Sequence, residues 1–185
     1  MNLDNYKEEL NLLDDMHQSY SLLFIALNKI QTDADANLKD ITLRQLMLLI
    51  TVAHLNEEEA TIIRIADTIG TSKQNITRLV NSMIKSGCLV STPSSTDKRS
   101  VNIKITEKGL AVMKENTIIS NQYFLKIFNK FTKEEISSLR NLLSKLSDYD
   151  DSGKQHLETK APIDIEKDSE EMSDFLKDMR RLFFK

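Results

Sequence analysis

A run of polar and basic side chains between residues 72 and 78 has the residue types that hydrogen-bond to nucleic acid. Its members are Ser72, Lys73, Gln74, Asn75, Thr77 and Arg78. Gln, Asn and Arg make paired hydrogen bonds with the edges of adenine and guanine, whereas Lys, Ser and Thr suit phosphate oxygens. A merely solvated helix face would have the same composition, so the elements around the run must decide between the two interpretations.

Two short helices joined by a tight turn are predicted to position this run. The first helix has one apolar face, made of Ile65, Ala66 and Ile69. Thr61 is its predicted N-cap, and Gly70 allows the sharp turn because glycine adopts positive φ at little steric cost. Ser72 caps the second helix, whose apolar residues recur at helical period: Ile76, Leu79, Val80, Met83 and Ile84. The pattern predicts a helix-turn-helix.

A two-stranded hairpin is predicted after this second helix, which we expect to end at Gly87 as its C-cap. Residues 89–92 and 101–105 have strand character, with apolar side chains alternating at Val101, Ile103 and Ile105. The hairpin makes a DNA-binding interpretation of the polar helix more convincing than the helix alone does.

The tip of the hairpin is polar and carries Asp97, Lys98 and Arg99. An arginine at such a tip can enter an A·T-rich minor groove, where the potential is most negative. An unpaired Asp97 carboxylate would repel phosphate. We therefore expect Asp97 to pair with Arg99 or Arg78 and to hold that guanidinium in place.

The charge distribution favours an oriented DNA-binding surface. Residues 71–108 hold seven basic and two acidic side chains, a local net charge of +5, whereas the whole chain carries −3, so the remainder carries −8. A basic surface on an acidic body is the electrostatic footprint of a docked DNA-binding protein. Affinity for DNA should therefore fall steeply with salt.

The helix-turn-helix, the hairpin with Asp97-Lys98-Arg99 and the following Ile105-Thr106-Glu107-Lys108-Gly109 strongly resemble the MarR family of winged helix-turn-helix transcription regulators. The specific part is an Asp-x-Arg wing followed by a (Leu/Ile)-Thr-x-x-Gly helix start. The resemblance covers about residues 6–149. It implies a homodimer whose recognition helices, residues 72–78 here, enter successive major grooves while the wings, with Asp97 and Arg99, touch flanking minor grooves.

Amphipathic helices are predicted on both sides of the winged helix. Residues 3–30 form a long one, and Thr42 with Gln45 makes a capping box for the next. A helix over 107–130 precedes a second capping box, at Thr132 and Glu135. The apolar faces exceed what a compact winged helix needs, which predicts burial by a second copy; the alternative is a larger monomeric core.

The predicted fold is mainly α with a small β-wing, and it divides the chain into five segments. These are an N-terminal dimerisation helix and connection (1–41), the DNA-binding domain (42–106), dimerisation helices (107–149), an acidic linker (150–171) and an amphipathic C-terminal helix (172–185). We expect the last helix to dock on the dimerisation helices; membrane-surface binding is the alternative, disfavoured by its mixed charges.

The resemblance also implies a crevice for a small-molecule effector between the dimerisation helices and the DNA-binding domain. Candidate lining residues are His17, Tyr20, Phe24, Met47 and His54. The same residue types are ordinary core formers. Ligand binding would favour a dimer whose recognition helices are wrongly spaced for successive grooves.

Other chemistries have little support in the sequence. No nucleophile–base arrangement or phosphate-binding glycine loop is present, which argues against an enzyme or a bound cofactor. The histidines lack metal-ligand spacing, so no metal site is expected. The lone Cys88 is expected to be a buried hydrophobic residue, with redox sensing as the alternative. One cysteine and no long apolar run favour a cytoplasmic protein without a membrane segment.

The sequence thus predicts a sequence-specific DNA-binding transcription regulator, acting as a ligand-responsive homodimeric repressor on a palindromic operator. The alternative is a protein-interaction adaptor that uses the winged helix as a scaffold and the C-terminal helix as its docking element.

Overall fold

The computed structural model describes residues 3–55, 59–93, 101–149 and 170–184. The chain divides into two compact units, residues 1–37 and 38–185, and each is described by itself. The first unit is one long helix, α1 (Leu3–Asn37), which continues seven residues beyond the predicted end at Ile30. Its large apolar side chains are exposed, among them Leu12, Leu22 and Phe24. The finer division into five segments remains a prediction.

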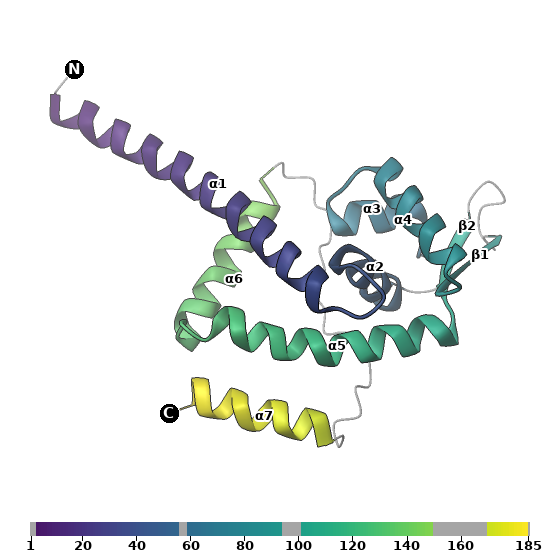
Figure 1. Cartoon of the computed structure of the whole chain (residues 1–185). Coiled ribbons are helices and arrows are strands. Elements are labelled where there is room, and N and C mark those ends of the chain that lie inside the picture. The colour runs from purple at the N-terminus through teal and green to yellow at the C-terminus, as the bar shows by residue number, and fades with distance from the viewer. Residues whose placement is uncertain (1–2, 56–58, 94–100, 150–169, 185) are drawn as a thin grey trace. The chain divides into compact units, whose positions relative to one another are not determined.

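The second unit holds the remaining helices and one two-stranded antiparallel sheet (Figure 1). Its elements are α2 (Leu43–His54), α3 (Ile62–Ile69), α4 (Lys73–Lys85), β1 (Leu89–Pro93), β2 (Val101–Ile105), α5 (Glu107–Phe128), α6 (Lys133–Ser147) and α7 (Glu170–Phe183). A mainly helical fold with a small β-wing was predicted, and the structure confirms it.

The core of this unit lies where α2, α3, α4, β2 and α5 meet. Helix α2 is its centre, because Leu46, Leu48 and Leu49 are all almost completely buried. The predicted stripe on α4 faces this core through Ile76, Val80 and Met83, while its other apolar members are partly buried. Burying such side chains stabilises the unit by roughly 1.5–3 kcal/mol each, and it leaves the polar side of α4 in solvent.

Side-chain caps set several helix starts, as predicted. The side chain of Thr42 accepts from the backbone N–H of Gln45, whose own side chain accepts from the backbone N–H of Thr42. Thr132 and Glu135 form the same capping box at the start of α6. These caps satisfy backbone donors that the first turn of a helix leaves without partners.

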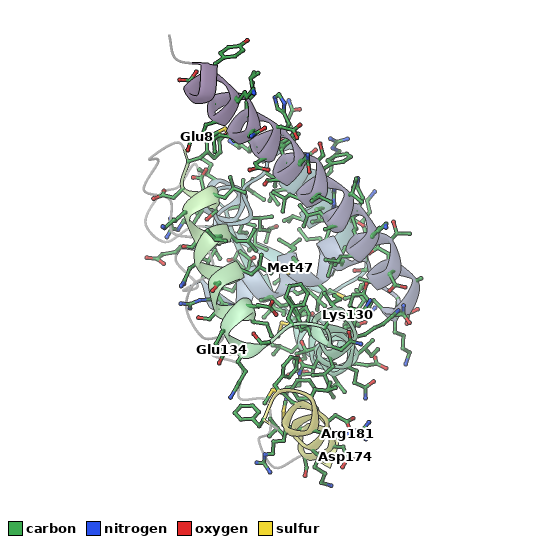
Figure 2. The ribbon with its side chains drawn as sticks, turned by 90° about the vertical axis from the view of Figure 1, so that its left-hand side faces the viewer. Glu8, Met47, Lys130, Glu134, Asp174 and Arg181 are labelled. Carbon is green, nitrogen blue, oxygen red and sulfur yellow. The ribbon has the colours of Figure 1, made fainter. Side chains whose placement is uncertain are left out.

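Helix α7 lies beside α5, and the two helices are in contact (Figure 1). Its apolar stripe is half-buried at Met172, Phe175, Leu176, Met179 and Phe183. Just beyond the helix, the Phe184 ring lies 4.6 Å from Nζ of Lys133, which starts α6. Figure 2 looks close to the axis of α7, with the charged residues Asp174 and Arg181 labelled on this helix. In the structure, the C-terminal helix therefore packs against α5.

Candidate nucleic-acid interface

The turn between α3 and α4 has the geometry of a helix-turn-helix. Thr61 caps α3, its hydroxyl oxygen accepting from the backbone N–H of Arg64 at 3.2 Å. Gly70 has φ +72°, and Thr71 N donates to the carbonyl of Ala66 at 3.0 Å. A Cβ added at Gly70 would meet no atom within 4 Å, so the left-handed backbone alone demands glycine here.

Helix α4 presents its predicted polar face to solvent. Ser72 caps the helix, with its Oγ accepting from the backbone N–H of Asn75 at 3.2 Å. All six predicted recognition residues are exposed: Ser72, Lys73, Gln74, Asn75, Thr77 and Arg78. No acidic residue lies in the first turn, so the positive end of the helix dipole is uncompensated there and favours a phosphate.

Some of these side chains are already engaged within the helix. The hydroxyl of Thr77 donates to the carbonyl of Lys73 at 2.8 Å. Arg78 Nη2 donates to Oδ1 of Asn75 at 2.7 Å. Lys73 and Gln74 extend from the exposed side of the first turn. All six residues are accessible from solvent, but they do not have equal hydrogen-bonding capacity for DNA.

The wing is described up to its tip. Strands β1 and β2 pair in antiparallel register from Leu89 opposite Ile105 to Pro93 opposite Val101. Asp97, Lys98 and Arg99 lie outside the described residues, and so does any pairing of Asp97 with Arg99. Arg78, the other predicted partner of Asp97, is held by Asn75. The contribution of the wing tip to DNA binding therefore remains a prediction.

The end of α4 differs slightly from the prediction. The C-cap is Ser86, and Gly87 follows it with φ +77°. The backbone N–H groups of Gly87 and Cys88 donate to the carbonyls of Ile84 and Met83, each at 2.9 Å. Gly87 therefore ends the helix, although it lies one position after the C-cap. A left-handed residue at this position closes the last turn.

Thr106 and Gly109 join the wing, α4 and α5 into one rigid corner. The Thr106 hydroxyl lies 2.7 Å from the carbonyl oxygen of Gly87 and accepts from the backbone N–H of Gly109 at 3.0 Å. A Cβ on Gly109 would lie 2.1 Å from the carbonyl oxygen of Cys88, which only glycine avoids. Lys108 Nζ donates to the carbonyl of Ser86 at 2.6 Å, so this lysine supports the end of α4. The Thr-x-x-Gly pattern thus sets how the wing leaves the recognition helix.

Asn102 is a structural residue that the sequence did not indicate. In a regular strand, the apolar residues Val101, Ile103 and Ile105 would share one side and Asn102 would lie on the other. Val101 is instead exposed, Ile105 is half-buried, and Asn102 is buried beside Ile103. The segment before α3 pairs along the edge of β2: Ile103 N donates to the carbonyl of Ala60 at 2.8 Å, and Asn102 is bridged to Thr61. The strand also contacts α2, α3 and α5. Both faces of β2 are therefore partly covered.

The predicted effector residues fall in both units. His17, Tyr20 and Phe24 are exposed on α1, and Met47 and His54 lie on α2. His54 Nδ1 lies 2.7 Å from the carbonyl oxygen of Ile50, and since a carbonyl can only accept, Nδ1 is the donor in this contact. Their grouping into one ligand site remains a prediction.

The described residues show no alternative chemistry at these positions. Among them, no group of three His, Cys, Asp or Glu side chains lies close enough to hold a metal ion. Cys88 is a free, buried thiol. No described helix is long and apolar enough to cross a membrane.

Comparison with known proteins agrees with this geometry. The MarR family model matches residues 39–100. The HTH-type transcriptional regulator SarZ of Staphylococcus aureus is 27% identical over 136 residues, covering 70% of this chain and 89% of SarZ. These relatives are transcription regulators, not enzymes.

Solved structures show the same fold. The organohalide-sensing transcriptional regulator RdhR, bound to 2,4-dichlorophenol, superposes with a TM-score of 0.69 at 22% identity, over 78% of this chain and 89% of that one. A mutant of MarR from E. coli in complex with operator DNA gives 0.64 at 21% identity, over 73% and 97%. With the helix-turn-helix, the wing and the Thr-x-x-Gly corner in place, residues 39–100 match the MarR family, and the fold of the chain is that of winged helix-turn-helix transcription regulators.

Proposed function

We propose that this protein is a homodimeric, ligand-responsive repressor that binds a palindromic operator in the cytoplasm. The observation that carries the proposal is the exposed polar face of α4, which a cap, a glycine turn and the Thr106–Gly109 corner hold rigidly beside the wing. A rigid helix with Gln, Asn and Arg on one side can enter a major groove and contact base edges.

Selection of bound genomic fragments, followed by a salt titration on the selected site, tests DNA recognition. We expect a palindrome with half-sites about one helical turn apart and affinity that falls steeply with salt. Arg99→Ala should weaken binding to all sequences, whereas Gln74→Ala should relax the preference at one position. Lys114→Ala, an exposed change on α5, is the control. DNA binding without sequence preference would contradict the proposal.

The exposed apolar side chains of α1 and α6 support the dimer. Helix α6 has no buried residue, and its exposed apolar side chains are Leu142, Leu143, Leu146 and, just beyond it, Tyr149. Soluble proteins rarely leave such surfaces in water, so a second copy is the expected cover. Sedimentation equilibrium should find a dimer that Leu142→Glu weakens and that Ser137→Glu, on the opposite side of α6, leaves intact. A monomer at micromolar concentration would contradict this.

A small-molecule effector is the remaining part of the proposal. The RdhR structure contains 2,4-dichlorophenol, and that of CouR from Rhodococcus jostii contains p-coumaroyl-CoA. Aromatic side chains and histidines among the candidate residues suit ligands of this aromatic class. We expect at least one member of a panel of phenols and aromatic acids to release the protein from its operator, and Tyr20→Ala or His54→Ala to reduce that response without changing ligand-free DNA affinity.

The adaptor alternative has less support than the regulator. It requires the apolar stripe of α7 to be available to another protein. In the structure that stripe is half-buried, and α7 contacts α5.

A further inference from the structure

Three side chains at the start of α4 form a series of hydrogen bonds. Asn75 Nδ2 lies 3.3 Å from Oγ1 of Thr71, in the turn before the N-cap Ser72, and Asn75 Oδ1 accepts from Arg78 Nη2 at 2.7 Å. Asn75 and Arg78 are three positions apart on α4, so their side chains are neighbours on the helix surface. Asn75 is the central member and touches both neighbours.

The orientation of the Asn75 amide follows from chemistry. A guanidinium has only donors, so the amide end that faces Arg78 must be the oxygen. The amide nitrogen then faces Thr71, whose hydroxyl can accept. The hydrogen bonds thus determine which end of the amide is which, although the two ends have nearly the same shape.

We propose that Asn75 is a positioning residue that orients Arg78 to contact a guanine in the major groove, and that it is not itself the residue that contacts adenine. This inference rests on the proposed operator binding. An asparagine that reads adenine uses its oxygen to accept from N6 and its nitrogen to donate to N7. Here both ends of the Asn75 amide already have partners, Thr71 in the turn and Arg78 on the helix, whereas the guanidinium of Arg78 keeps further N–H groups for the O6 and N7 acceptors of guanine.

Pre-orientation matters because arginine has a long side chain with many rotamers. Ordering it only on contact with DNA would oppose binding, whereas a side chain held in place loses less freedom. The partner is a neutral amide, and no acidic residue lies in the first turn of α4. Arg78 therefore keeps its full positive charge for the operator, which an ion pair with a carboxylate would offset.

Site selection from a randomised duplex library tests the assignment with full-length protein. Wild type should prefer guanine at one position of each half-site, and Arg78→Ala should abolish that preference. Asn75→Ala should reduce it roughly tenfold at the same position. The double variant should match Arg78→Ala, because Asn75 acts through Arg78. Lys114→Ala, an exposed change on α5, should leave the guanine preference unchanged.

A second measurement examines the free protein. The Nε–Hε group of Arg78 should be more ordered on the nanosecond timescale in wild type than in Asn75→Ala, and Asn75→Asp, which keeps the acceptor oxygen, should restore the order. A merely structural role for Asn75 would leave this signal unchanged.

Two results would overturn the inference while DNA recognition stands. The first is that Asn75→Ala loses an adenine preference at another position of the DNA half-site and keeps the guanine preference. The other is no change in either measurement. If wild type shows no sequence-selective binding at all, the proposed operator function fails first and this inference fails with it.

Discussion

The buried side-chain amide of Asn116 holds the backbone of Lys39 through both of its ends. Asn116 Oδ1 accepts from Lys39 N at 2.8 Å, and Asn116 Nδ2 donates to the carbonyl of Lys39 at 3.1 Å. Asn116 is fully buried on α5, and Lys39 lies in the connection before α2. The contact joins α5 to the connection that leads into α2. On the surface beside it, Lys39 Nζ and Glu115 Oε1 form an ion pair of 2.6 Å.

Asn116→Ala should lower the free energy of unfolding by about 1–3 kcal/mol, because it leaves a partly buried N–H and carbonyl without partners. Urea denaturation followed by circular dichroism measures this. Asn129→Ala, at the exposed end of α5, should change stability by much less. Equal midpoints for the two variants would show that the Asn116–Lys39 contact contributes no stability.

Gly109 and Gly70 should respond differently to substitution because they are glycine for different reasons. At Gly109, Cβ would collide with the Cys88 backbone, so Gly109→Ala should cost about 1–3 kcal/mol and Gly109→Asn at least as much. At Gly70 only the positive φ is demanding, so Gly70→Asn should be milder than Gly70→Ala, since asparagine tolerates the left-handed region. Thermal unfolding of the four variants checks the order.

Docking of α7 predicts that a charge in its apolar stripe will unfold it. With 14 residues, α7 is at the limit of helix stability in isolation. Leu176→Asp should therefore abolish amide-exchange protection throughout α7, while Ser173→Asp, on its exposed side, should preserve it. Retained protection in Leu176→Asp would mean that the contact with α5 does not hold the helix.

The first turn of α6 should lose stability as the pH falls. A hydrogen bond from its own backbone N–H and one from the Thr132 hydroxyl lower the pKa of Glu134 below the ordinary 4.5. A lowered pKa contributes stability above pH 4.5 that is lost as pH falls through the folded value. An NMR titration of the Glu134 carboxyl should give a midpoint below 4.5, and Thr132→Ala should move it upward; an unchanged midpoint would contradict the role of Thr132.

Sequence alone was sufficient for the elements whose causes are local. The capping boxes at Thr42 and Thr132 join groups three residues apart, and the turn at Gly70 depends on one backbone angle. The period of the α4 stripe likewise determines which face is polar, because a helix repeats every 3.6 residues. These features identified the helix-turn-helix and its exposed recognition residues without knowledge of the fold.

Tertiary structure alone decided the contacts between distant parts of the chain. Asn116 meets Lys39 across 77 residues, and no periodic pattern marks either of them. Asn102 is buried where β2 pairs with the segment before α3 and contacts α2, α3 and α5, none of which the alternation of apolar residues in the strand could reveal. Asn75 belonged to the polar face in the sequence, but only side-chain geometry showed that its amide is committed to Arg78. Local propensity acts within a few residues, whereas these partners are set by how whole elements pack.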